Sequence, residues 1–207
     1  MKPTSIVAIA GGLLVIALLA IVLTGKIEGQ VVDDVTGAPI AGAFIVGVWR
    51  GYVASPAHGS TGCYHIEFRT TDAHGRFSIS EFAGNINPLR SDREVSVGVY
   101  APGYSIEQNP DGGLYRAKLR TGDKSKQFSE IAMAPTYDCV GQRDPRLLPM
   151  YRAFAAEKGA LASTKAERKA SIEAQFLVDS VELGESEALK RHGSRLTKLY
   201  EEMEKAK

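Results

Sequence analysis

The stretch TTDAHGRFSI, from Thr70 to Ile79, places a polar turn with one glycine between two strand-like runs. The preceding run, CYHIEFRTT, alternates apolar and polar side chains, and so does RFSIS after the turn. Alternation with a period of two is typical of strands that bury one face. The stretch therefore predicts two strands joined at Asp72–Gly75, and it leaves open whether His74 serves chemistry or only the turn.

Residues 26–136 continue this pattern as short apolar runs separated by turn signals. In the segment DDVTGAPIAG, Gly37 and Pro39 are placed for a tight reversal. Short strands at regular spacing are typical of an antiparallel β-sandwich or barrel, and the alternation indicates sheets covered on one face only. A mainly β fold is predicted. Its further strands are AFIVGVWRG, REVSVGVY with Val95, Val97 and Val99 inward, Leu114–Leu119 and Phe128–Met133.

Three segments of this region, taken in order, resemble the carboxypeptidase regulatory-like domain, a transthyretin-like β-sandwich. They are IEGQVVDDVTGAPIAGAFIVGV, TTDAHGRFSI and VSVGVYAPGY. They match the family pattern of a G-x-V start, a G-x-P turn, T-D-x-x-G-x-F and V-x-A-x-G-Y. The resemblance covers residues 27–135, about half of the chain. It implies a fold but little about function, because the family serves as an accessory module on many unrelated proteins.

The resemblance also implies structural roles for individual residues. Asp72 and Gly75 build the hairpin, because the carboxylate accepts hydrogen bonds from the N–H groups after it and glycine adopts a positive φ without a Cβ clash. His74 is then a solvent-facing turn residue. Tyr104, in the A-x-G-Y segment, is expected to close one end of the sandwich.

Residues 1–25 are predicted to anchor the chain in a membrane. The 18 residues from Ile6 to Leu23 contain no charge and no proline, and at about 1.5 Å each they extend roughly 27 Å, close to the thickness of bilayer hydrocarbon. A cleaved signal peptide usually has a shorter apolar run and an A-x-A-like site, so an uncleaved anchor is favoured. Lys2 precedes the run and acidic residues follow it, which orients the bulk of the chain outward, periplasmic or extracellular.

The chain has two cysteines, Cys63 and Cys139. In an exported domain an even number of cysteines indicates a disulfide, and two allow one pairing. Closing a loop of about 75 residues would stabilise the fold by roughly 4 kcal/mol in the chain-entropy model. A thiolate metal site is the alternative, which the absence of a CxxC pair disfavours.

From residue 137 the chain becomes charged and rich in alanine. Residues 137–162 are predicted to form a linker with a short helix over Arg146–Lys158, interrupted at Gly159. Residues 163–207 are predicted to form a charged helical extension.

Within this extension, Ser163 or Thr164 can cap a helix that runs to about Leu183, with Glu167 as the capping-box acid and Gly184 as the break before a second helix. Whether these helices pack on the sandwich, on each other or as a short coiled coil stays open. The residues that repeat every seven positions are Leu189, Leu196 and Met203, with His192 between them.

Catalytic and metal-binding motifs are missing from the sequence. The histidines are His58, His65, His74 and His192, and they form no HExxH or H-x-H pair. This argues against a zinc peptidase and against an intradiol dioxygenase. GxSxG, Walker A and GxGxxG are absent too. No enzymatic activity, cofactor or metal is therefore predicted, and a hydrolase built on the loop from His58 to His65 is the least favoured hypothesis.

A binding role is the remaining functional class. The 25 basic and 24 acidic residues nearly balance, so the net charge implies no nucleic-acid partner, and none is predicted. We expect a non-enzymatic, single-pass protein of the bacterial inner membrane and envelope. Its sandwich would be a platform and its C-terminal helices would dock an envelope protein. The alternative is a carbohydrate- or peptidoglycan-binding module that stacks a glycan on exposed Trp49 and Tyr52.

Overall fold

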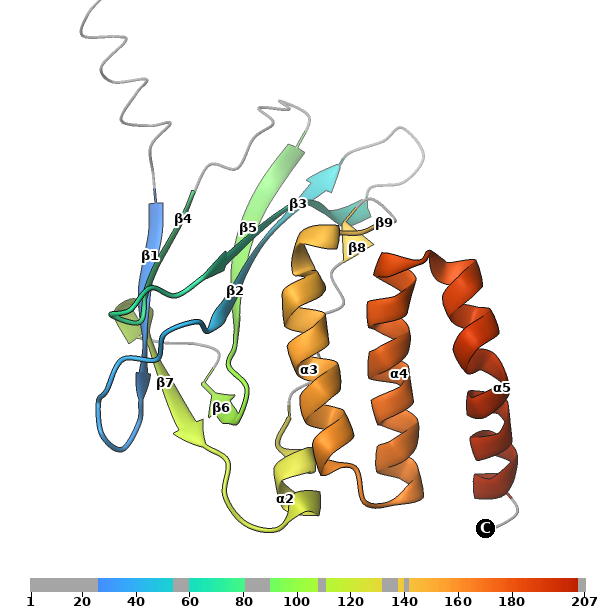
Figure 1. Ribbon diagram of the computed structural model, residues 1–207. Helices are drawn as coiled ribbons and strands as arrows, with labels where there is room; N and C mark the ends of the chain where they lie inside the picture. Colours follow the sequence, from blue (N-terminus) through green and yellow to red (C-terminus); the bar gives the residue numbers. More distant parts are fainter. Residues whose placement is uncertain are drawn as a thin grey trace, which may run out of the picture.

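The fold was obtained as a computed structural model, which describes residues 26–53, 60–80, 90–107, 111–131, 138–139 and 142–204 (Figure 1). The predicted anchor, Ile6–Leu23, lies outside these residues. In the described ranges, none of the helices has both the length and the apolar composition that a bilayer span requires.

Nine strands and six helical segments follow one another along the described residues. The strands are β1 (Lys26–Asp33), β2 (Phe44–Val53), β3 (Ser60–Thr70), β4 (Arg76–Ser80), β5 (Arg90–Tyr100), β6 (Tyr104–Ile106), β7 (Leu114–Leu119), β8 (Asp138–Cys139) and β9 (Gln142–Arg143). The helical segments are η1 (Asp111–Gly113), α2 (Lys124–Ser129), η2 (Pro145–Leu147), α3 (Leu148–Leu161), α4 (Lys165–Glu182) and α5 (Glu185–Glu204).

Two sheets carry most of the strands. One has four strands in the order β4-β1-β7-β6, the other has three in the order β3-β2-β5, and β8 pairs with β9. β1 runs antiparallel to β4 but parallel to β7. The larger sheet is therefore mixed, which corrects the prediction of a purely antiparallel fold. Between β1 and β7 the chain forms the three strands of the other sheet, together with β4, and then returns to the four-stranded sheet through β6. β7 follows β6 and runs parallel to β1.

The facing sides of the two sheets share one buried cluster. β1 and β4 contribute alternate residues, as the pattern RFSIS predicted. The cluster is Val31, Ala43, Ile45, Trp49, Phe77, Ile79, Val99, Ala101, Tyr115 and Ala117, with Val95, Val97 and Tyr104 partly buried beside it. The inward placement predicted for the alternating valines of β5 is confirmed.

The opposite side of the three-stranded sheet packs on helices. Val46, Val48 and Ile66 from this sheet share a second cluster with residues of α3 and α4. The described chain thus has three layers, with the four-stranded sheet outermost, the three-stranded sheet central and the helices on the far side (Figure 1). The helices are as extensive as the strands, so the prediction of a mainly β protein was wrong. The prediction of sheets covered on one face holds for the four-stranded sheet but not for the central sheet, which is covered on both.

The predicted turns are confirmed. Asp72 accepts hydrogen bonds from the N–H groups of His74 at 2.8 Å and Arg76 at 2.9 Å, which lower the pKa of its carboxyl. Gly75 has a φ of +68°, and a Cβ there would lie 2.4 Å from the Val31 carbonyl oxygen. The His74 residue is exposed, as expected.

The β1–β2 connection also follows its prediction. Gly37 has a φ of +69° and donates its N–H to the Asp33 carbonyl oxygen at 2.9 Å. Pro39 lies directly beyond this turn and forms an isolated bridge with Val32. Turn chemistry in DDVTGAPIAG was therefore sufficient to place the reversal.

Two local predictions were wrong. Phe128–Met133 was expected to be a strand, but Phe128 is buried in helix α2, because Asp123 caps that helix by accepting the Lys126 N–H. Gly159 was expected to interrupt a helix, but α3 continues through it to Leu161. A single glycine costs only about 1 kcal/mol in a helix interior, which packing readily offsets.

Candidate functional site

The C-terminal helices form a layer in which each helix contacts the previous one. α3 packs against the central sheet, α4 packs on α3, and α5 packs on α4 (Figure 1). Thr164 caps α4 in a full capping box with Glu167, and Gly184, at a φ of +86°, separates α4 from α5. The predicted caps and break are confirmed. α5 forms the outer border of the layer.

A buried carboxylate joins the last two helices. Asp179 of α4 lies 2.8 Å from Nε2 of His192 and 3.0 Å from a guanidinium nitrogen of Arg191, both on α5. Burial raises the pKa of Asp179, but hydrogen bonds from His192, Gln175 and Arg191 outweigh burial and lower the pKa overall. The contacts from Arg191 and His192 hold α5 against α4 in one register, whereas Gln175 lies on α4 itself.

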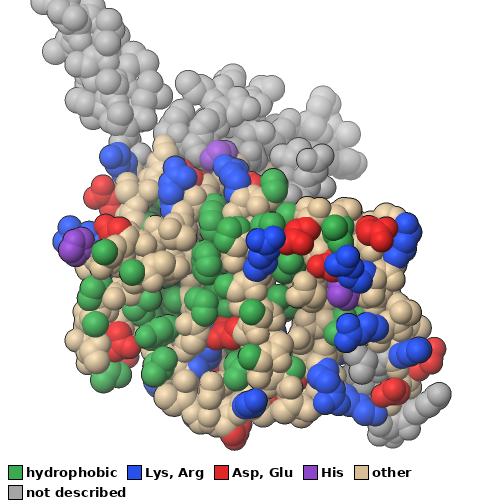
Figure 2. Space-filling view, in the orientation of Figure 1, with side chains coloured by type: hydrophobic (Ala, Val, Ile, Leu, Met, Phe, Trp, Pro, Cys, Tyr) green, Lys and Arg blue, Asp and Glu red, His purple; other side chains and the backbone are tan. Residues whose placement is uncertain are grey.

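α5 has an inner and an outer side. Ala188 and His192 are buried against α4, whereas the Leu189 residue is 59% exposed. Of the packing modes left open by the sequence, the structure shows α5 packed on α4, with the intervening His192 buried and Leu189 outside the contact. Charges of both signs are interspersed over the helical side of the molecule (Figure 2).

A second carboxylate ties the helices to the sheets. Glu157 of α3 accepts hydrogen bonds from the Tyr100 hydroxyl at 2.7 Å and from the Gly103 N–H at 2.6 Å, and it forms an ion pair with Arg120. Arg120 also donates to the Tyr104 carbonyl oxygen at 2.6 Å. Burial and the Glu157 hydrogen bond raise the pKa of Tyr100. This network locks α3 to the ends of β5, β6 and β7.

Glu167 extends the polar contacts to α2. Its carboxylate accepts hydrogen bonds from the Ser125 hydroxyl, from the backbone and hydroxyl of Ser163, and from the Thr164 N–H. These bonds, the Ser125 contact foremost, lower the pKa of Glu167. Close by, the Lys158 ammonium lies 4.1 Å above the Phe128 ring. The α3–α4 connection is thus fastened to α2.

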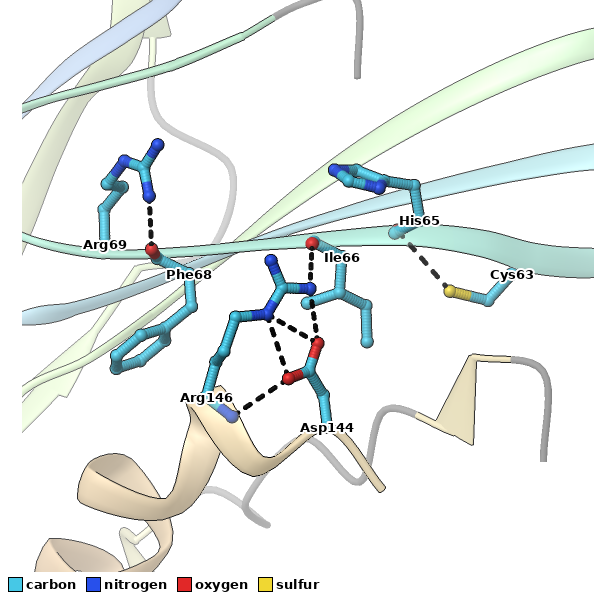
Figure 3. A network of polar contacts seen from close by, with 7 residues as sticks. All are labelled: Cys63, His65, Ile66, Phe68, Arg69, Asp144 and Arg146. Carbon is cyan, nitrogen blue, oxygen red and sulfur yellow. Dashed lines mark hydrogen bonds and ion pairs between the residues drawn. The ribbon is translucent and has the colours of Figure 1, made fainter. Parts of the chain in front are cut away.

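The outer edge of β3 meets the start of the helical region (Figure 3). Arg146 donates to the Ile66 carbonyl oxygen at 2.9 Å and to both carboxylate oxygens of Asp144. The Arg146 side chain lowers the pKa of Asp144. Arg146 thereby occupies part of the edge of β3 and anchors η2.

His65 on the same strand lies in a structural setting. Its ring packs edge-on against Trp49, with ring centroids 5.1 Å apart. Burial lowers the pKa of His65, and the positive charge of Arg146 lowers it further. His58, the other residue of the hydrolase hypothesis, lies outside the described residues. In the described part of the chain, no group of three or more His, Cys, Asp or Glu side chains is arranged to hold a metal ion.

The aromatic residues proposed for stacking have different settings. Trp49 is only 2% exposed and belongs to the cluster between the sheets, so it offers no surface to a glycan. Tyr52 lies near the end of β2, and its side chain is outside the described part. Tyr104 begins β6 and is partly buried against the same cluster as Trp49, in agreement with its expected structural role.

The described residues include no free cysteine. β8, which ends at Cys139, contacts β3, which carries Cys63. The backbone segments of the two cysteines therefore lie together. The side chain of Cys139 is not among those described, and the Cys63–Cys139 disulfide stays a prediction.

The residues that join the layers could not be singled out in the sequence. Glu157 and Arg120 are 37 positions apart, and neither belongs to a motif. The one available signal was that Glu157 falls in a predicted helix. No known protein family, no curated protein and no solved structure matches the chain.

Proposed function

We propose that this protein is a membrane-anchored, non-enzymatic envelope protein that docks a partner protein on helix α5. The observation that carries this proposal is the position of α5, a 20-residue helix that packs on α4 and ends the helical layer. Its outer side presents Leu189 among charged residues, a composition that suits a partly polar protein interface.

The sheets supply a rigid base for this helix. The two sheets share one core, and Asp72 and Gly75 build the hairpin in the way that the resemblance to the carboxypeptidase regulatory-like family implies. These features support a transthyretin-like β-sandwich as the finer description of the fold. The hydrogen bonds and the ion pair of Glu157 then fix the position of α3 relative to the sheets.

The direction of the strands supports an anchor at one end. Lys26 pairs with Ser80 in one sheet, and Val53 pairs with Ser60 and Arg90 in the other. All these strand ends lie together, opposite the C-terminal end of α5 (Figure 1). An anchor formed by residues 1–25 would place this end toward the bilayer and the end of α5 away from it.

A test of docking must leave α4 intact. Deleting the whole extension would remove Ala174 and Val178, which belong to the core cluster with the central sheet, and loss of binding would then report unfolding. Single substitutions on the exposed side of α5 avoid this problem because they leave the buried contacts in place.

The experiment compares Leu189→Asp with Leu119→Asp as a matched control. Leu119 is a 51% exposed leucine on β7, in the sheet layer farthest from the helices. After chemical cross-linking in native membranes, we expect the wild type and Leu119→Asp to capture the same stoichiometric partner, and Leu189→Asp to lose it. Capture of that partner by Leu189→Asp at the wild-type level would refute docking on α5.

A further inference from the structure

A hollow on the outer face of the four-stranded sheet lies in the layer farthest from the helices. Its volume is about 330 Å³, and its lining consists of Glu28, Gly29, Gln30, Arg76, Gly112, Gly113 and Leu114. Ile27 and Val31 point into the cluster between the sheets, so Glu28 and Gln30 alternate onto the outer face. The volume is at the lower end of the range for small-ligand sites.

Two opposite charges border this hollow without neutralising each other. Glu28 pairs in register with Ser78, and Gln30 pairs with Arg76, which makes Glu28 and Arg76 diagonal neighbours on adjacent strands. Diagonal neighbours on one face are about 7–8 Å apart, and their Cβ atoms are somewhat closer. Among the described residues, no ion pair joins Glu28 to Arg76. The positive charge of Arg76 also acts on Asp72, where it adds to the backbone hydrogen bonds that lower the pKa of that carboxyl.

The polar side chain of Gln30, which neighbours both charged residues, is held in place. The Gln30 side chain donates from Nε2 to the His74 carbonyl oxygen at 2.9 Å. This bond fixes the orientation of the amide and leaves its oxygen to accept a hydrogen bond from a ligand. The hollow therefore offers a carboxylate and an amide oxygen on β1, with a guanidinium on β4 directly across from the amide-bearing residue.

The backbone of Gly112 and Gly113 forms another side of the hollow. Gly112 and Gly113 have φ values of +61° and +81°, and a Cβ on Gly113 would lie 2.7 Å from the Glu28 carbonyl oxygen. A Cβ on Gly112 would meet no atom within 4 Å. The turn packs tightly on β1, and no side chain from Gly112 or Gly113 fills the space above it.

We infer that this hollow binds a short zwitterionic peptide of about dipeptide length, with its ammonium group on Glu28 and its carboxylate on Arg76. The charges of a single amino acid lie only about 2.5 Å apart, whereas an extended dipeptide spans roughly 7 Å, which is comparable with the usual spacing of diagonal strand positions such as those of Glu28 and Arg76. Arg favours carboxylates because its planar guanidinium donates two parallel hydrogen bonds.

The probe is L-alanyl-L-alanine, titrated into the ¹⁵N-labelled full-length protein in a non-ionic detergent. We expect saturable shifts of the Gly29 and Gly113 amide resonances. N-acetyl-alanyl-alanine carries only the negative charge and alanyl-alanine amide only the positive one. Each should bind about tenfold more weakly, because each loses one charge-assisted contact. Free alanine should also bind more weakly than the dipeptide.

Substitutions test whether Glu28 and Arg76 are the residues that bind the dipeptide. Glu28→Gln and Arg76→Gln should each weaken dipeptide binding about tenfold, and the matched controls Glu107→Gln and Arg116→Gln, in the same outer layer, should not change it. Absence of saturable shifts overturns the inference. So does equal binding of the singly charged peptides, or unchanged binding by Arg76→Gln. None of these results depends on α5, so they are separate from the test of docking.

Discussion

Replacing Val178 by alanine tests whether the C-terminal helices are part of the folded core. Val178 is 4% exposed and belongs to the cluster that joins α4 to the central sheet. The change removes two buried methyl groups, a loss of about 1.6 kcal/mol in transfer free energy, and the cavity raises the expected cost to about 2–3 kcal/mol. Leu189→Ala is the control, since substitutions of exposed residues usually change stability by less than about 0.5 kcal/mol.

The single tryptophan makes the assay selective. Trp49 lies between the two sheets, in the other cluster from Val178, so its fluorescence reports the sheets while far-UV circular dichroism at 222 nm reports mainly the helices. A urea m-value of about 2–3 kcal/mol/M for a chain of this size converts the expected loss into a midpoint about 1 M lower.

We expect both signals to shift together by this amount in Val178→Ala and to stay unchanged in Leu189→Ala. If the circular dichroism midpoint falls while the Trp49 fluorescence midpoint stays at the wild-type value, the helices unfold as a separate unit. That result would refute a shared core.

Three other changes have defined outcomes. Glu157→Gln leaves the buried Arg120 guanidinium without its counter-charge and should destabilise the fold by about 3 kcal/mol in urea unfolding; a loss below about 1 kcal/mol would contradict the network. The pKa of Glu167 is lowered in the fold, so its stabilisation is present above the unfolded pKa of about 4.3 and is lost as the pH falls further; Glu167→Gln should lack this acid dependence in thermal melts. A Cys63–Cys139 disulfide predicts no thiol reacting with Ellman's reagent in the unreduced, denatured protein, and a loss of about 4 kcal/mol on reduction.

Local chemistry explains which parts of the fold were predictable. The Asp72 carboxylate bonds only to its own turn, and the positive φ of Gly75 needs no distant partner, so the hairpin could be predicted from the sequence. The same holds for the Thr164 cap and the Gly184 break. By contrast, the run FIVGVW in β2 is apolar at nearly every position, and only the packing of α3 shows that both faces are covered.

The candidate interaction surface was predictable in place but not in detail. The seven-residue repeat of Leu189, Leu196 and Met203 left the packed side of the last helix open, and a straight helix of 3.6 residues per turn carries its contacts through Ala188 and His192. The Glu157–Arg120 pair forms only when α3 lies on the sheet ends. Similarly, Glu28 and Arg76 meet at one hollow only because β1 and β4 are paired.

If residues 1–25 anchor the chain in a membrane as proposed, the opposite placement of Lys26 and the C-terminal end of α5 would make the molecule a spacer. A helix of 20 residues is about 30 Å long, so a bilayer at the Lys26 end would have the last turn of α5 held tens of ångströms above it. Any domain fused after Glu204 would be held at the same distance from the bilayer. The reach of such a fusion could be tuned by whole turns added to α5, without touching the sheets.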